Sequence, residues 1–230
     1  MLKYSKEQQP YLKICGITQP EEIQLLDDLG VNFAGVWSGI PEGMYNLSRQ
    51  ELLSLSLSTR NSLKLILVTL HNTLSTIKSL VESVDLAGIQ LHGFQLPSFV
   101  QQIRDAFGES LQIFKVLHVH GEICVEDNLI QRYIQAGVDI FIIDTFQNKH
   151  HIGSTGIPLK EDFLDRFIPD RLAANQIILA GGIAPSNIRQ ICYNYRPFGI
   201  DIDSAARKNG KINKACVARL MAQMHHDKTH

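Results

Sequence analysis

The 230-residue sequence predicts an α/β protein with the (β/α)8 TIM barrel fold. Eight short apolar segments alternate with stretches long enough for a helix, an order typical of parallel strands joined by crossovers. Some segments, such as residues 63–68, are apolar at nearly every position, which indicates burial on both faces. A doubly wound open sheet is the alternative, but no Gly-x-Gly-x-x-Gly pattern follows the first strand.

Helix signals separate the expected strands. After the first strand, Thr18 is placed to cap a helix, Pro20 to occupy its first turn and Gly30 to end it. Later crossovers repeat this pattern: Pro97 opens a run that ends at Gly108, residues 128–136 precede Gly137, and residues 185–187 open another helix. The expected strands are residues 11–16, 33–38, 63–70, 86–92, 112–119, 140–145, 176–181 and 199–203.

Composition indicates a globular protein and excludes two classes of partner. The chain is 44% hydrophobic and 20% charged, and it has no apolar run of the ~18 residues that a membrane helix needs. A formal net charge of −1 gives no basic surface for nucleic acid. Because no linker divides the sequence, we expect one domain over residues 1–230, with flexible tails at 1–9 and 225–230.

The cysteines indicate a reducing compartment. Cys15, Cys124, Cys192 and Cys216 lack the spacing of a disulfide scaffold or a Cys-x-x-Cys motif. The amino terminus has no apolar secretion core. We therefore expect a cytoplasmic protein.

Two reactive residues end strands of the predicted barrel. Cys15 ends the first expected strand and Asp144 the sixth, and the carboxyl ends of barrel strands share one rim. A thiol and a carboxyl that meet there form a candidate base and acid. Lys13 lies on the same strand face as Cys15, where its charge favours the thiolate. Alternatively, Cys15 is a small buried core residue.

Glycine-rich turns at the same rim indicate a phosphorylated small-molecule substrate. Paired glycines let backbone N–H groups approach a ligand closely, although they also suit a tight turn. The candidate phosphate-binding residues are Gly153, Ser154, Thr155 and Gly156 after the sixth strand, Gly181 and Gly182 after the seventh, and Ser204 and Ala205 after the eighth.

Three histidines raise a metal hypothesis. His92, His118 and His120 lie at or near the ends of the fourth and fifth strands, but the sequence lacks the carboxylates or strict spacing that usually accompany such a site. We therefore predict no metal. Trp37 ends the second strand, where it is placed either to stack on a ligand or to pack in the core.

Several segments together resemble the phosphoribosylanthranilate isomerase family, in the family's order and over nearly the whole chain. They are Lys13-Ile-Cys-Gly-Ile-Thr18, Gly88-Ile-Gln-Leu-His-Gly93, Phe141-Ile-Ile-Asp-Thr145, Leu179-Ala-Gly-Gly-Ile-Ala-Pro-Ser-Asn187 and Arg196-Pro-Phe-Gly-Ile-Asp201. The resemblance implies the Amadori rearrangement of N-(5-phosphoribosyl)anthranilate to 1-(2-carboxyphenylamino)-1-deoxyribulose 5-phosphate in tryptophan biosynthesis, an aldose–ketose isomerisation without cofactor or metal.

The resemblance also implies roles for individual residues. Asp144 protonates the ring oxygen and opens the furanose, and Cys15 removes the C2 proton of the resulting Schiff base. The enolamine then tautomerises to the aminoketose. Lys13, His92 and Asp201 are implied substrate-binding residues.

The chain departs from the family pattern at three places. Tyr45, or Met44 with a one-residue shift, stands where the family carries an arginine that binds the anthranilate carboxylate, so we place Tyr45 in the substrate site, with Arg49 nearby. Asp203, Ala205 and Arg207 change the strand-eight loop, and Ser154 and Ile157 replace the usual glycine and lysine of the strand-six loop. An isomerase acting on another sugar phosphate amine and a non-catalytic ligand-binding descendant therefore stay open. The assembly is a monomer or a homodimer.

Overall fold

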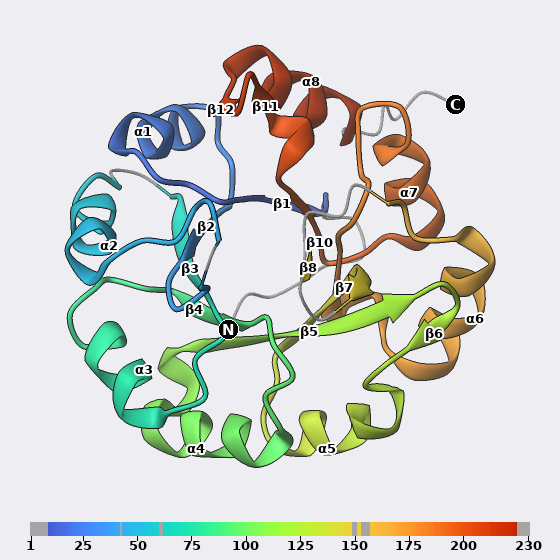
Figure 1. Ribbon diagram of the computed structural model, residues 1–230. Coiled ribbons are helices and arrows are strands. Elements are labelled where there is room, and N and C mark those ends of the chain that lie inside the picture. The colour runs from blue at the N-terminus through green and yellow to red at the C-terminus, as the bar shows by residue number, and fades with distance from the viewer. Residues whose placement is uncertain (1–8, 42, 60–61, 149–150, 153–156, 225–230) are drawn as a thin grey trace.

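The computed structural model describes residues 9–41, 43–59, 62–148, 151–152 and 157–224, which form a closed barrel of parallel strands inside a ring of helices (Figure 1). Within these residues the barrel strands are β1 (Tyr11–Cys15), β2 (Phe33–Trp37), β3 (Lys64–Thr69), β4 (Gly88–Leu91), β5 (Gln112–His120), β7 (Ile140–Asn148), β9 (Ile177–Leu179) and β10 (Gly199–Ile202). Strand β10 pairs with β1, and β5 pairs with β7, so the barrel closes. The predicted barrel is confirmed, and the open-sheet alternative is wrong.

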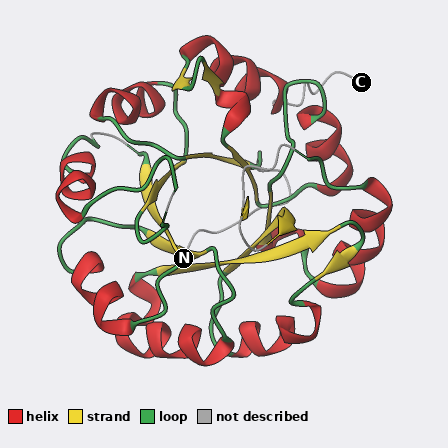
Figure 2. Cartoon of the chain, in the orientation of Figure 1, coloured by secondary structure: helices red, strands yellow, loops and turns green. Residues whose placement is uncertain are grey.

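Helices surround the strands on the outside of the barrel (Figure 2). Each buries one face against the sheet; α4, for example, buries Phe99, Val100 and Ile103, which share one side of a helix. None of the helices in the described part of the chain is long and apolar enough to cross a membrane. The helices are α1 (Pro20–Asp28), α2 (Arg49–Ser56), α3 (Leu74–Val81), α4 (Pro97–Phe107), α5 (Ile130–Gln135), α6 (Glu161–Arg171), α7 (Ile188–Tyr195) and α8 (Lys214–Met224).

Local details differ from the sequence-based expectations. The residue that caps α1 is Gln19 and not Thr18. The Glu22 carboxylate, three residues into the helix, accepts the backbone N–H of Gln19 at 3.2 Å and that of Thr18 at 2.9 Å. Helix α5 begins at Ile130, after a 3-10 turn over Asp127–Leu129, and not at 128.

Short antiparallel pairings were also not predicted, since two-residue strands carry no hydrophobic period. Strand β5 pairs with β6 (Ile123–Cys124), β7 with β8 (His151–Ile152), and β11 (Arg207–Lys208) with β12 (Lys211–Ile212). Residues 1–8 and 225–230, most of the expected tails, lie outside the described residues.

An aromatic layer fills the barrel below the site. The rings of Tyr11 and Phe198 lie 4.7 Å apart between centroids, and those of Phe33 and Phe114 lie 6.1 Å apart. Side chains alternate along a strand, so on β1 the residues that share the inward face with Tyr11 are Lys13 and Cys15. The aromatic layer therefore supports polar groups at the carboxyl ends of the strands.

Candidate active site

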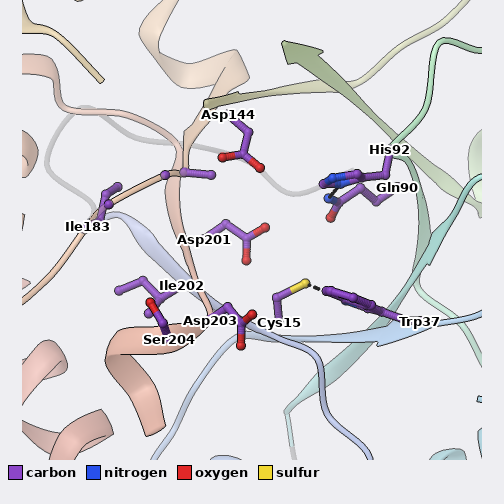
Figure 3. Close-up of a pocket in the computed structure, with 13 residues that line it drawn as sticks. Cys15, Trp37, Gln90, His92, Asp144, Ile183, Asp201, Ile202, Asp203 and Ser204 are labelled. Carbon is purple, nitrogen blue, oxygen red and sulfur yellow. Dashed lines mark hydrogen bonds between the residues drawn. The ribbon is translucent and has the colours of Figure 1, made fainter. Parts of the chain in front are cut away.

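A pocket opens at the carboxyl ends of the barrel strands, and both Cys15 and Asp144 line it (Figure 3). The two residues come from β1 and β7, which are far apart in the sequence and are brought together by barrel closure. The other lining residues come from β2, β4 and β10 and from the segments after β4, β9 and β10. The structure thus supplies the convergence of thiol and carboxyl that the sequence predicts.

The Cys15 sulfur faces two nitrogen donors. The indole Nε1–H of Trp37 donates to Sγ at 3.1 Å, and the Lys13 ammonium lies 3.4 Å from it. Burial raises the pKa of the Cys15 thiol to about 11, against the lowering effect of Lys13 and of the Trp37 hydrogen bond, while the Asp201 charge adds to the rise. Cys15 therefore rests as a thiol at neutral pH.

Asp144 is a buried carboxyl suited to giving up a proton near neutrality. It lies in the middle of β7, which continues past it to Asn148, so the expectation that Asp144 ends its strand is wrong; its register partner on β5 is His118. Burial raises the pKa of Asp144 to about 7, and the nearby Asp201 charge adds to the rise, whereas the Thr145 backbone N–H and Lys13 oppose it. A substantial fraction of Asp144 is therefore protonated at pH 7.

Lys13 and Asp201 form a buried ion pair beside the pocket. The ammonium lies 2.7 Å from Oδ2 of Asp201, and the Lys13 side chain is fully buried. Burial alone lowers the pKa of Lys13, but the charges of Asp201 and Cys15 outweigh it and raise the pKa overall. Oδ1 of Asp201 has no hydrogen-bond partner among the described residues. It is a buried acceptor in the wall of the pocket.

Gln90 and Gly35 are site residues that sequence reasoning missed. Gln90, buried on β4, donates to Nδ1 of His92 at 2.9 Å, and its carbonyl oxygen has no partner within the described residues. A Cβ on Gly35 would lie 2.8 Å from the Cys15 sulfur and 3.0 Å from the Lys13 ammonium, so the glycine makes room for both. A buried polar side chain and a glycine inside apolar strands were the signals available.

His92 lines the pocket as a neutral imidazole. Burial, and then the charge of His118, lower the pKa of His92 well below its ordinary value. The rings of His118 and His120 are engaged elsewhere: His118 contacts Glu126 at 2.6 Å and the His92 carbonyl at 3.0 Å, and His120 contacts the Phe146 carbonyl at 3.1 Å. The His92 and His118 rings lie 6.0 Å apart, but the ring nitrogens of His118 and Nδ1 of His120 already have hydrogen-bond partners.

The glycine turns meet the pocket after β9. Gly181 and Gly182 line it with φ angles of +81° and +59°, values that favour glycine, and Ser204 lines it after β10. Ala205 follows Ser204 in a short 3-10 turn. The predicted phosphate-binding residues Gly153, Ser154, Thr155 and Gly156 lie outside the described residues.

Residues 12–223 match the family model described as N-(5'-phosphoribosyl)anthranilate isomerase. The chain belongs to the phosphoribosylanthranilate isomerase family. A relative named for this activity from Synechocystis is 31% identical over 93% of this chain and 94% of its own length. One from Rippkaea orientalis is 29% identical over 93% of this chain and 95% of its own.

Solved structures of phosphoribosylanthranilate isomerases share the fold. The Thermotoga maritima protein superposes with a TM-score of 0.76 at 21% identity, covering 94% of this chain and 98% of that one. The Thermus thermophilus protein gives a TM-score of 0.75 at 21% identity, covering 93% and 98%. Another was solved in complex with reduced 1-(o-carboxyphenylamino)-1-deoxyribulose 5-phosphate, with a TM-score of 0.73 at 20% identity, covering 94% and 98%.

The arginines near the departures from the family pattern are already engaged. Arg49 donates from Nε to the Ser83 hydroxyl at 2.9 Å. Arg207 forms an ion pair with Asp203 at 2.7 Å and donates to the Cys15 and Gly16 carbonyls. The expected Asp203 charge is therefore compensated, and Tyr45 lies against Arg207 in a cavity beside the pocket.

Proposed function

We propose that this chain carries out the reaction for which its family is named, with Asp144 as the general acid and Cys15 as the general base. One observation carries the assignment of roles: the two side chains line the same pocket at the rim of the barrel. The reaction is the Amadori rearrangement of N-(5'-phosphoribosyl)anthranilate to the 1-deoxyribulose 5-phosphate, within tryptophan biosynthesis. It requires only proton transfers.

Asp144 starts the reaction. The pKa of about 7 leaves it partly protonated at neutral pH, so it gives a proton to the furanose ring oxygen as the C1–O bond breaks. The nitrogen lone pair forms the C1=N bond, and the ring opens to a cationic Schiff base. The buried carboxylate left behind stabilises that cation.

Cys15 acts on the Schiff base. As a thiolate it removes the proton from C2, and the electron pair of that bond forms the enolamine, which tautomerises to the aminoketose. The resting thiol has a pKa of about 11, so the base exists in a small fraction of molecules. The positive charge of the Schiff base favours the thiolate when it is needed, since a nearby cation lowers a thiol pKa.

Hydrogen-bond acceptors around the pocket suit a sugar. The unpartnered Gln90 carbonyl oxygen and Asp201 Oδ1 are placed to accept hydrogen bonds from substrate hydroxyls, with neutral His92 beside them. For the phosphate we propose Gly181, Gly182, Ser204 and Ala205, joined by the segment 153–156. The positive φ angles of the two glycines support this role.

A second candidate rests on the charge of the pocket. The described lining includes three aspartates, Asp144, Asp201 and Asp203, and neither a lysine nor an arginine. An anthranilate carboxylate adds a second anionic group beside that set, whereas a sugar phosphate amine without a carboxylate brings only its phosphate. The two candidates are separated by comparing turnover of phosphoribosylanthranilate with that of the corresponding aniline derivative.

The deciding experiment follows the fluorescence of freshly generated phosphoribosylanthranilate with the purified protein, and with Cys15→Ser as control. Loss of substrate that the substitution abolishes would support the proposal. Folded protein without turnover on either amine would leave the non-catalytic, ligand-binding alternative.

We further propose a cytoplasmic monomer or homodimer whose partner is a phosphorylated small molecule. Cys15, Cys124, Cys192 and Cys216 are free thiols, as a reducing compartment allows. Fractionation of cells and sedimentation of the purified protein test location and assembly.

A further inference from the structure

Three side chains form a closed chain of contacts around Cys15. The first is Trp37, whose Nε1–H donates to the sulfur at 3.1 Å. An indole nitrogen is a donor only, so this contact requires the sulfur to be the acceptor. A donor aimed at sulfur favours the thiolate over the thiol.

Tyr45 holds the Trp37 ring from the side. The two ring centroids lie 5.2 Å apart at an interplanar angle of 75°, an edge-to-face contact of the kind that aromatic pairs prefer. On its other side Tyr45 meets Arg207, whose guanidinium carbon lies 4.2 Å from the Tyr45 ring centroid. Tyr45 is therefore fixed between two flat groups.

Arg207 contacts the backbone of Cys15 and so completes the set of contacts. One terminal nitrogen donates to the carbonyls of Cys15 and Gly16, at 3.0 and 2.7 Å. Its Nε donates to Asp203 at 2.7 Å, and the side chain is only 6% exposed. Arg207 thus joins the loops after β1 and β10 and presents a rigid face to Tyr45.

Gly16 shows how tightly these groups pack. Its φ is +75°, and an added Cβ would lie 2.5 Å from Cδ2 of Tyr45 and 2.8 Å from a terminal nitrogen of Arg207. Tyr45 and Arg207 are two of the positions where the chain departs from the family pattern. Their direct contact gives both departures a common role.

We propose that Tyr45 and Arg207 are positioning residues that hold the Trp37 indole N–H on the Cys15 sulfur and so set how readily Cys15 ionises. The inference deepens the proposed role of Cys15 as a base. Its test needs no substrate, so it fails or succeeds independently of the isomerase activity.

The charged groups that face Cys15 come from each neighbouring element. Lys13 on β1 favours the thiolate, whereas Asp201 on β10 and Asp203 after it disfavour it. Arg207 pairs with Asp203 and reduces that repulsion. Burial raises the pKa of Tyr45 above its ordinary value of 10.0, so its phenol is neutral at the pH of the test.

The test measures the rate at which iodoacetamide alkylates Cys15 at about pH 9, with the modified peptide quantified by mass spectrometry. Trp37→Phe keeps an aromatic ring but removes the N–H, and we expect a rate about 10-fold lower. Phenylalanine is smaller than tryptophan, so reduced access to the sulfur cannot explain a fall. An unchanged rate in a folded Trp37→Phe protein would overturn the inference.

Tyr45 is tested with a matched pair. Tyr45→Phe keeps the ring and should leave the alkylation rate within about 2-fold, whereas Tyr45→Leu should lower it about 5-fold or more. In the Trp37→Phe background, Tyr45→Leu should have no further effect, because Tyr45 acts through Trp37. Equal rates for the two Tyr45 variants, or independent effects in the double variant, would refute the positioning role.

Arg207→Lys keeps a charge opposite Asp203 but removes the planar group that contacts Tyr45. We expect this variant to lower the alkylation rate of Cys15, and to have no further effect once Trp37 is phenylalanine. A wild-type rate in Arg207→Lys would remove Arg207 from the proposal. Thermal unfolding of every variant confirms that the rates are compared between folded proteins.

Discussion

Lys13 and Asp201 lie 188 positions apart in the sequence and form a 2.7 Å ion pair whose side chains are 0% and 8% exposed. The pair closes the β1–β10 seam of the barrel and holds the ammonium 3.4 Å from the Cys15 sulfur. One contact therefore serves the fold and the chemistry at once.

Lys13→Met should destabilise the protein by about 3–5 kcal/mol, because it leaves the Asp201 carboxylate buried without its partner. Urea denaturation measures the change. The double substitution Lys13→Met with Asp201→Leu should recover much of the loss, since neither charge is then stranded. A double variant as unstable as Lys13→Met would show that packing, and not the unpaired charge, is responsible.

Cys15→Ser should lower turnover about 100-fold or more, because a hydroxyl is a far weaker acid than a thiol and forms no useful base at neutral pH. The fluorescence assay measures it. Cys216→Ser is the matched control: that thiol is half-buried on α8 and does not line the pocket, so its loss should change turnover less than about 2-fold. Comparable losses in both variants would remove Cys15 from the role of base.

Asp144→Asn should abolish most turnover yet stabilise the fold at pH 8. The folded-state pKa of Asp144 is raised from 3.8 to about 7, so stability falls as pH rises between these values, because the unfolded chain releases its proton first. The shift corresponds to at most about 4 kcal/mol. Urea denaturation should show a higher free energy of unfolding for Asp144→Asn than for the unsubstituted protein at about pH 8, and little difference at about pH 4. The same difference at both pH values would contradict the raised pKa.

The pH dependence of kcat/KM should rise about tenfold per unit up to about pH 7 and then stay level. Activity needs the Cys15 thiolate, with a pKa of about 11, and protonated Asp144, with a pKa of about 7. Above pH 7 the gain in thiolate offsets the loss of the protonated acid. Rates measured between about pH 5 and 9 decide the matter: a fall above pH 7 would mean that Cys15 is already ionised there.

Gly181→Ala should lower kcat/KM about 10-fold or more, because the new Cβ would lie 2.6 Å from the Thr145 hydroxyl and 3.1 Å from Oδ1 of Asp144. Gly30→Ala is the control: Gly30 has a similar φ, +77° against +81°, and open space around its Cβ. Both variants should lose similar stability from the positive φ, Gly181→Ala should lose more through the overlap with Thr145, and only Gly181→Ala should lose activity. Equal activities would show that the space at Gly181 is not needed.

Local sequence patterns determined the barrel strands, the ends of some helices and the two reactive residues. Apolar strand segments and Pro or Gly signals act within a few residues, so helix α4 and the positions of Cys15 and Asp144 were predicted from them. The shared rim of a parallel barrel then predicted that the two residues meet. The two-residue strand pairings, such as β11 with β12, were not predicted because strands this short show no hydrophobic periodicity.

Only the tertiary structure decided what surrounds the sulfur. The partners of Cys15 depend on the stagger between strands and on the paths of loops, which local sequence patterns do not encode. Strand β1 pairs with β2 so that Cys15 lies opposite Gly35. Because Gly35 has no Cβ, there is room for the thiol and for the Lys13 side chain. Trp37 was expected to stack on a ligand or to pack in the core; it lines the pocket and also donates to the sulfur, a contact that was not predicted. The sequence determined which groups reach the rim, and the closed barrel decided their hydrogen bonds and pKa values, because those depend on distances between segments remote in the chain.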